Sequence, residues 1–117
     1  MKHPALFTAV LFTIAPTLAG SAFAAPAAVQ TVATVHIKNF AYVKPSLKIH
    51  AGDSVLFIND DGDAHTVTSD DKAFASGGMD TGDRWTHTFS KAGTFHYFCA
   101  LHPYMKGTII VAPAGKH

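Results

Sequence analysis

Short apolar runs separated by turn-forming residues dominate the chain after position 30. Seven runs are rich in β-branched and aromatic residues, and they cover residues 31–37, 47–50, 54–59, 65–69, 84–89, 94–98 and 107–111. Between them lie clusters of Gly, Pro and Asp such as AGD, DDGD and SGGMDTGD. No stretch keeps a helical period over the length of an ordinary helix. This spacing predicts an all-β domain, either a sandwich or a barrel.

The pattern within three of these runs predicts which side chains face the core. SVLFIN is apolar on both faces from Val55 to Ile58, which is typical of a central strand, whereas RWTHTF alternates like a strand with one exposed face. In TFHYFC, the residues Phe95, Tyr97 and Cys99 share one side of the strand. We therefore expect this side to face the core and the Cys99 thiol to be semi-buried at the end of the sheet.

The N-terminal residues have the pattern of an export signal. A basic start precedes the mostly apolar stretch PALFTAVLFTIAPTLAG, and Ala22 and Ala24 flank Phe23 just after it. We interpret residues 1–24 as a secretory signal peptide that is cleaved after Ala24, which predicts a periplasmic location. The stretch is interrupted by Thr and Pro and is too short for a good membrane span, which needs about 20 apolar residues. An uncleaved anchor is therefore the weaker alternative.

Residues 25–117 form the predicted mature chain of 93 residues, which is enough for one small domain and too few for two. This chain balances eight basic against eight acidic side chains, and every acid is Asp. The balance gives no reason to expect binding to nucleic acid or stable association with a membrane. We interpret Asp60, Asp61 and Asp63 as turn residues and not as a calcium loop, because that motif ends in Glu and the chain has none.

Cys99 is the only cysteine in the chain. Small exported domains commonly pair their cysteines in disulfides, and a single cysteine cannot form an internal one. A free thiol in an oxidising compartment is a liability unless it is buried, joined to another chain or bound to a metal. For a lone cysteine taken by itself, an inert buried thiol is the commonest of these outcomes. The neighbouring residues therefore decide between them.

The neighbours of Cys99 favour a metal. In FCALHPYMKG, His102 and Met105 follow it at intervals of three. A thiolate, two imidazoles and a distant thioether are the ligands of a blue-copper electron-transfer site. Fully extended, residues 99–105 would span roughly 20 Å, so this segment must curl into a loop to bring its donors together. Zinc also binds Cys and His, but a thioether is a good ligand for copper and a poor one for zinc.

A second imidazole must come from elsewhere in the chain. The candidates are His36, His50, His65, His87, His96 and His117. His96 faces the opposite side of its strand from Cys99, and three others lie at solvent-facing mid-strand positions (36 and 87) or on the terminal tail (117). His50 ends a short strand, and His65 stands where a turn-rich loop meets the next run, so that it can meet a loop from another strand. We favour His65.

The mature chain resembles the small blue-copper proteins, or cupredoxins, and within them the amicyanin and plastocyanin-like branch. The resemblance runs through IKNFAYVKPSLKIHAGDSVLFIN, DAHTVTSDD and KAGTFHYFCALHPYMKGTIIV, with the short Cys-x2-His-x2-Met loop that is typical of amicyanin. It implies a Greek-key β-sandwich or barrel with the metal site in loops at one end. It also implies one copper ion, with His65, Cys99, His102 and Met105 as its ligands.

Two positions beside His65 depart from the family pattern. Thr66 stands where many cupredoxins have Asn, whose backbone amide bonds the thiolate sulfur and whose side chain holds the ligand loop. Thr66 keeps the amide, and the sequence leaves the side-chain link open. Ala64 stands where amicyanin-like chains often have Pro, which weakens any inference about the partner that docks there.

The resemblance implies a periplasmic carrier of single electrons and not an enzyme. By the same resemblance, the edge of His102 reaches the surface within an apolar patch, where redox partners of unknown identity would dock transiently. The residues expected in this patch are Ala64, Leu101, Pro103 and Tyr104. We expect the protein to be a monomer.

Two other classes of function stay open. A periplasmic copper carrier or buffer would pass metal in place of electrons, but such proteins usually offer several Met or His residues in exposed tracts. The mature chain has only Met79 and Met105, and we interpret Met79 as a loop or surface residue. A structural dimer linked through Cys99 is the third class. A multicopper oxidase is excluded, because the chain has one cysteine and no His-x-His pair.

Overall fold

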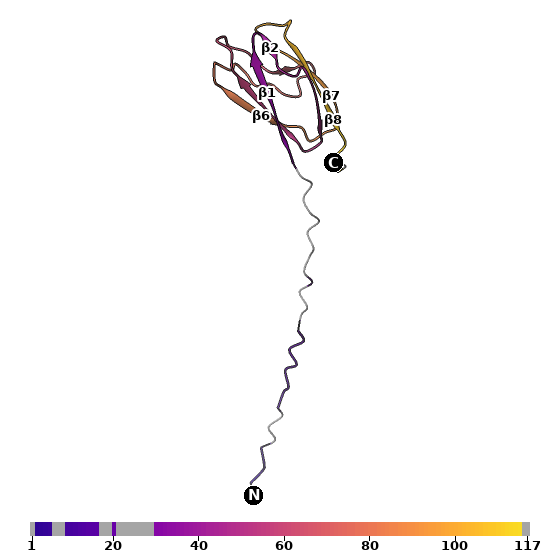
Figure 1. The fold of residues 1–117 in the computed structure, drawn as a ribbon. Helices are drawn as coiled ribbons and strands as arrows, with labels where there is room; N and C mark the ends of the chain where they lie inside the picture. Colours follow the sequence, from indigo (N-terminus) through magenta and orange to yellow (C-terminus); the bar gives the residue numbers. More distant parts are fainter. Residues whose placement is uncertain (1, 6–8, 17–19, 21–29, 116–117) are drawn as a thin grey trace.

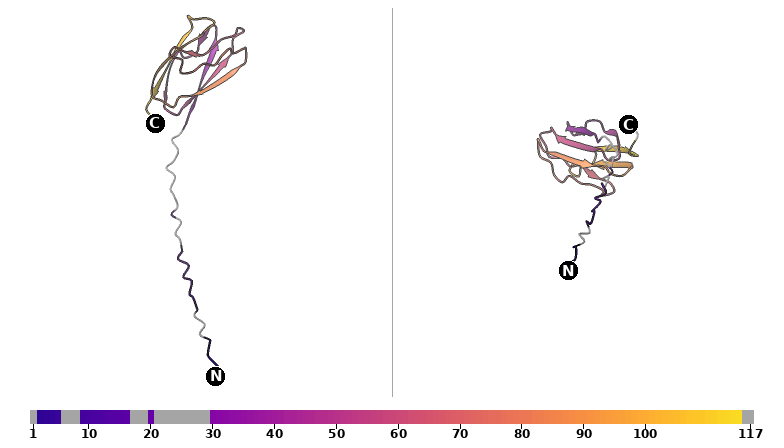
Figure 2. Two further views of the ribbon diagram at one scale, coloured as in Figure 1. Left: turned by 180° about the vertical axis from the view of Figure 1, so that it is seen from behind. Right: turned by 90° about the horizontal axis from the view of Figure 1, so that it is seen from below.

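The computed structural model describes residues 2–5, 9–16, 20 and 30–115, and within these ranges it contains strands and no helix (Figure 1). The strands are β1 (Val32–Lys38), β2 (Ala41–Tyr42), β3 (Ser46–His50), β4 (Ser54–Asn59), β5 (Thr68–Ser69), β6 (Arg84–Thr88), β7 (Gly93–Phe98) and β8 (Lys106–Ala112). They form two four-stranded sheets, ordered β2-β1-β4-β6 and β3-β8-β7-β5, which face each other in a sandwich (Figure 2). The predicted all-β sandwich is confirmed.

The first sheet is centred on β1 and β4, which pair in parallel from Val32↔Ser54 to Ile37↔Asn59. β6 pairs antiparallel on the other side of β4, so the predicted central position of SVLFIN is confirmed. β2 was not predicted, because two residues give no periodic pattern. It pairs with the end of β1 through a two-residue turn at Asn39–Phe40.

The second sheet carries the loop of residues 99–105, which contains Cys99, His102 and Met105. β7 and β8 pair antiparallel from Gly93↔Val111 to Phe98↔Lys106, and residues 99–105 connect them at the sheet's end. β3 lies parallel to β8 on the far side. The run 65–69 was predicted as a strand, but only Thr68 and Ser69 pair with β7. His65 lies before this strand and forms an isolated antiparallel bridge with Met79.

The core lies between the two sheets and is made from alternate residues of the central strands. Its fully buried side chains include Val35, Ile37, Val55, Phe57, Tyr97, Cys99 and Ile109. Phe95 and Tyr97 point inward as predicted, but Cys99 is completely buried and not semi-buried, because residues 99–105 fold back over it. Met79, which was predicted to be a loop or surface residue, lies in the loop before β6 and is buried there at 3% exposure.

His87 was predicted to face solvent, and this is wrong. RWTHTF alternates as expected, but His87 lies on the same half-buried side as Trp85. Its ring stacks on Trp85 at 5.4 Å between centroids and contacts Phe74 and Phe89. A neutral imidazole can pack among aromatic rings as well as face water. The polar character of His87 therefore did not decide which side of β6 it occupies.

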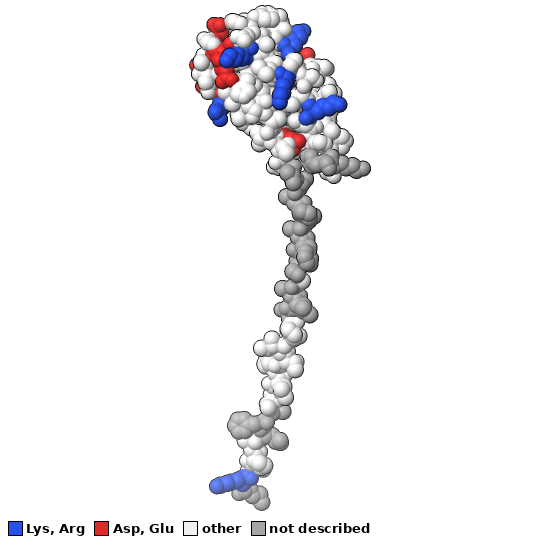
Figure 3. All heavy atoms as spheres, in the orientation of Figure 1, with Lys and Arg blue, Asp and Glu red and all other residues white. Residues whose placement is uncertain are grey.

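The described residues ahead of position 30 are exposed and belong to no strand. Leu11, Phe12 and Ile14 are each more than four-fifths exposed and contribute nothing to the core. The proposed cleavage position after Ala24 falls outside the described residues. No helix among the described residues is long and apolar enough to cross a membrane. On the face of the domain seen in Figure 3, basic and acidic side chains both occur.

Candidate metal centre

Three ligating side chains meet at one end of the sandwich, where the turn after β1, the loop after β4 and the loop after β7 come together. His65, Cys99 and His102 form the group of potential metal ligands that the described residues contain. His65 and Cys99 are fully buried, whereas His102 is half-buried. The structure therefore brings together three of the four predicted ligands at the predicted place, in loops at one end of the sheets.

The distances among the donor atoms fit a single ion. Cys99 Sγ lies 3.7 Å from His65 Nδ1 and 3.7 Å from His102 Nδ1, and the two nitrogens are 3.2 Å apart. A point about 2.1 Å from all three atoms lies inside this triangle, close to the usual lengths of metal–imidazole and metal–thiolate bonds. Three soft or borderline donors in one plane suit copper.

The loop that carries Cys99, His102 and Met105 is closed by its own backbone. The amide of His102 donates to the Cys99 carbonyl at 3.2 Å, and the amide of Met105 donates to the His102 carbonyl at 2.9 Å. The Cys99 amide then donates to the Met105 carbonyl at 3.1 Å, which joins the loop's two ends. These bonds produce the curl that the spacing required. Met105 is 2% exposed, so its thioether is held inside the domain at this end.

Thr66 connects His65 to the Cys99 loop in two ways. Its backbone amide donates to Cys99 Sγ at 3.3 Å, which places a hydrogen-bond donor at the sulfur that would ligate the metal. Its hydroxyl oxygen accepts from the Ala100 amide at 2.7 Å. The side-chain link that the sequence left open is therefore present, made by Thr in place of Asn. Tyr42 supports the same residue by donating its phenolic hydroxyl to the Thr66 carbonyl.

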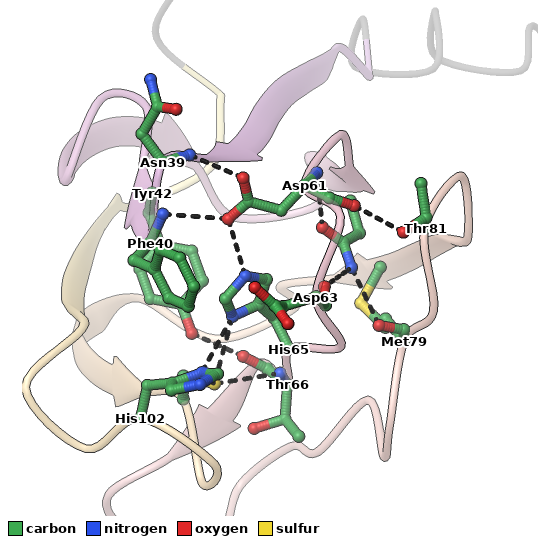
Figure 4. A network of polar contacts seen from close by, with 12 residues as sticks. Asn39, Phe40, Tyr42, Asp61, Asp63, His65, Thr66, Met79, Thr81 and His102 are labelled. Atoms are coloured by element: carbon green, nitrogen blue, oxygen red, sulfur yellow. Dashed lines mark hydrogen bonds and ion pairs between the residues drawn. The ribbon is translucent and has the colours of Figure 1, made fainter.

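Asp61 fixes the orientation of His65, a role that sequence reasoning missed. His65 Nε2 donates to Asp61 Oδ2 at 2.8 Å, which leaves the lone pair of Nδ1 free to face Cys99 and His102 (Figure 4). The amides of Phe40 and Asn39 also donate to this carboxylate, at 2.9 and 2.8 Å. These amides are the main reason that the pKa of Asp61 lies below its ordinary value, with His65 adding to the effect. Asp61 is thus more than the turn residue that was expected.

A second set of hydrogen bonds holds the loop that contains Asp61 and His65. Asn59 is fully buried, and its amide donates to the carbonyls of Asp63 and Met79, both at 2.9 Å. His65 and Met79 exchange backbone hydrogen bonds of 3.0 and 2.8 Å. Hydrogen bonds to Asn59 and to Met79 therefore both hold the loop, and His65 cannot turn away without breaking several buried hydrogen bonds.

The surface above the site is apolar. Leu101 is 56% exposed and Tyr104 is 69% exposed, and Pro103 is also exposed, while Ala64 is half-buried. His102 lies between Leu101 and Pro103 along the chain, and its ring centroid is 6.2 Å from that of Tyr104. The docking patch around His102 stays a prediction. Phe40 lies beside His102 and is 39% exposed. Sequence reasoning missed it, because it is far from the ligands along the chain.

The other histidines lie away from these donors. His36 Nδ1 forms an ion pair with Asp60, and His96 Nδ1 lies 3.1 Å from the Thr108 hydroxyl on the outer face of β7. His50 ends β3 as predicted, with Nδ1 3.9 Å from an Asp53 oxygen. His117 falls outside the described residues. His65 is thus the histidine that the structure places beside Cys99 and His102.

Comparison with known proteins identifies the family. The family model described as a Cupredoxin-like domain matches residues 5–111. The chain belongs to the cupredoxin family. It is 33% identical over 82 residues to amicyanin from Paracoccus versutus, a match that covers 66% of this chain and 62% of that protein. It is 31% identical over 96 residues to amicyanin from Paracoccus denitrificans, covering 78% of this chain and 73% of that protein.

Solved cupredoxin structures share the fold. A purple cupredoxin from Nitrosopumilus maritimus aligns with a TM-score of 0.65 and 30% identity, covering 68% of this chain and 99% of that one. A copper-containing nitrite reductase from Thermus scotoductus aligns with a TM-score of 0.64 over 68% of this chain but only 22% of the larger enzyme. Together with the donors present here, the family assigns one copper ion as the cofactor of this protein.

Proposed function

We propose that this cupredoxin is an exported electron carrier that cycles a single copper between its two oxidation states. His65, Cys99 and His102 would be its strong ligands, and Met105 would be the weak one. The observation that carries this proposal is the donor triangle, in which two imidazole nitrogens and one buried thiolate surround a point at bonding distance from all three. When bound, copper supplies a one-electron redox couple.

The surrounding protein favours fast electron transfer by keeping the ligands in place. The side chains of Asp61 and Thr66 and the backbone of Met79 hold His65 and the Cys99 loop through buried hydrogen bonds. A preorganised ligand set moves little when the charge of the site changes, so the cost of reorganisation is small.

His102 is the proposed point of entry and exit for electrons. It is the ligand that is only half-buried, and its inward nitrogen belongs to the donor triangle, so the ring connects the site to the surface. The apolar patch of Leu101, Pro103, Tyr104 and Ala64 around it gives a partner a small surface from which water can leave. Transient redox complexes have such interfaces, typically below about 1,200 Å² in total.

Export to the periplasm is the second part of the proposal. The apolar N-terminal stretch and the Ala-Phe-Ala sequence support a signal peptide of residues 1–24. If the protein is exported, intact-mass measurement of the material recovered from the periplasm gives the mass of residues 25–117. A mass that includes the N-terminal residues would reject cleavage.

A copper carrier or buffer is the alternative function. A carrier that passes copper on would require a ligand that leaves the copper easily, and the half-buried His102 is the candidate for such a ligand. Against this, three hydrogen bonds close the loop that holds His102, and the mature chain lacks an exposed Met or His tract. An enzyme of the multicopper kind needs further copper ligands, for which the sequence has no His-x-His pair.

Copper release and voltammetry separate the two functions. The copper-loaded protein is mixed with excess EDTA, or with a Cu(I) chelator after reduction, and is also cycled at an electrode. We expect slow release in both states and a reversible one-electron wave. Release of copper on mixing, without a reversible wave, would support the copper carrier and reject the electron carrier.

A further inference from the structure

Two successive residues with positive φ form the turn between β1 and β2. Asn39 has φ of 53° and Phe40 has φ of 56°, and Lys38 pairs with Ala41 across them. Two-residue hairpin turns of this kind prefer Asn followed by Gly. The left-handed conformation is unfavourable for a bulky residue with a Cβ atom, and such an outlier occurs mostly at functional positions. Phe40 is therefore a poor choice for the turn itself.

Asp61 connects this strained turn to the metal site through hydrogen bonds. One carboxylate oxygen accepts from the Asn39 amide at 2.8 Å, and the other accepts from the Phe40 amide at 2.9 Å. The second oxygen also accepts from His65 Nε2. The turn and the ligand His65 are thus attached to one buried carboxylate, which fixes the position of one relative to the other (Figure 4).

The ring of Phe40 lies against both imidazoles of the site. Its centroid is 5.4 Å from that of His65, with the rings 85° apart, and 5.1 Å from that of His102, with the rings 88° apart. Both contacts have the edge-to-face geometry that aromatic pairs prefer. The ring is 39% exposed, so one side covers the two ligands while the other faces solvent.

We propose that Phe40 is a shield over the copper ligands, held in a strained turn for that purpose. The inference rests on the proposed copper site. The ring excludes water and small anions from the side of the ion between the two imidazoles. It also limits the rotation of His102, the one ligand that is only half-buried, and so slows the loss of the metal. Phe40 is a positioning residue and does not bind copper.

The decisive variant is Phe40→Gly. Relief of backbone strain should keep or raise its melting temperature, whereas loss of the shielding ring should speed the release of copper. Glycine suits the left-handed turn and keeps the backbone amide that donates to Asp61. We expect the copper-free variant to melt at the same temperature as the wild type or higher. The copper-loaded variant should lose Cu(II) to EDTA at least roughly 10-fold faster, the scale of effect seen when residues around a metal site are altered. Added azide should change its visible spectrum at concentrations that leave the wild type unchanged.

Two matched variants complete the experiment. Phe40→Leu keeps an apolar side chain over the imidazoles, so its release rate should stay much closer to that of the wild type. Val43→Ala removes part of an apolar side chain that is 47% exposed and lies outside the turn, and it should behave as the wild type. Phe40→Asn, with a side chain that tolerates the left-handed region, replaces the glycine variant if that chain fails to fold.

The outcomes separate this inference from the proposed function. A wild-type protein that turns blue with copper, together with a Phe40→Gly variant of unchanged release rate and azide response, would overturn the shield alone. A wild-type protein that takes up copper without a blue colour would overturn the proposed function and the shield with it. Faster release in Val43→Ala equal to that in Phe40→Gly would also overturn the shield, because the effect would then be general.

Discussion

Among single residues, Gly107 shows how closely the core fits under the metal site. A Cβ atom at this position would lie 2.1 Å from Cζ and 2.3 Å from the hydroxyl of Tyr97. Tyr97 is 1% exposed, and burial raises the pKa of its phenol. The ring also contacts Tyr42 at 4.7 Å between centroids, so it cannot move aside freely. Glycine is required here for space and not for backbone freedom.

Gly107→Ala should therefore destabilise the protein strongly for a one-carbon change. Overpacking of this kind costs about 1–3 kcal/mol in free energy of unfolding. In a domain of this size that lowers the melting temperature by at least roughly 4 °C. Thermal unfolding of the copper-free protein measures it. Gly78→Ala is the matched control, since an added Cβ there meets nothing within 4 Å. Equal effects in the two variants would refute the packing argument.

The sequence predicted the ligands better than it predicted the residues that hold them. Cys99, His102 and Met105 are close in sequence, and their side-chain chemistry is specific to metal sites, so their spacing could be interpreted directly. Asp61 and Phe40 act through contacts between loops that are distant along the chain. Asp61 looked like a turn residue because three acids occur together there. Phe40 was not singled out, because it is one apolar residue far from the ligands along the chain.

Among the strands, β6 carries a partly buried histidine, His87, that the alternation of its sequence did not predict. Its inward side carries Trp85 and His87 against Phe74 and Phe89 of neighbouring segments. Burial among these rings lowers the pKa of His87 below its ordinary value, because the charged imidazolium loses hydration there. The neutral imidazole is thus the form that fits the folded sheet.

This burial should make stability depend on pH in a specific direction. Because the pKa of His87 is lower in the folded state, the unfolded chain binds more protons once the pH falls below about 6.5. Stability contributed by the neutral ring is present above that value and is lost as the pH falls through it, by at most about 1.4 kcal/mol for each pH unit. Melting temperatures of copper-free protein between pH 7.5 and pH 5 measure the loss.

His87→Phe is the variant that isolates this effect. Phenylalanine keeps an aromatic ring in the cluster and cannot take up a proton. We expect the fall in melting temperature from pH 7.5 to pH 5 to be smaller in the variant than in the wild type. An identical fall in both proteins would show that other groups determine the acid sensitivity.

The strands that sequence predicted least well are those with few residues. β4 matches its predicted run in full, because four consecutive apolar residues, Val55 to Ile58, give a strong signal. β2 and β5 have two residues each and are defined by their partners across the sheet. Tertiary pairing, and not local propensity, decides such elements. The bridge between His65 and Met79 belongs to the same class, and it buries a methionine that the sequence alone placed in a loop or at the surface.

In the molecule as a whole, the stable sandwich and the chemically active end are separate parts. The sheets bury a continuous apolar core, and the donor atoms lie in two connecting loops at one end of it, the loop after β4 and the loop after β7. Hydrogen bonds made by Asn59, Asp61 and Thr66 hold these loops in place. A one-electron carrier needs such a rigid site close to the surface, and this arrangement provides it.

The most direct test of the copper site is a visible absorption spectrum of the mature protein after addition of one equivalent of Cu(II), with Cys99→Ser as the control. We predict an intense blue band from the thiolate–copper bond in the wild type and its loss in the variant. A wild-type protein that stays colourless, or a band that persists without the Cys99 sulfur, would contradict a thiolate-ligated copper and with it the proposed electron transfer.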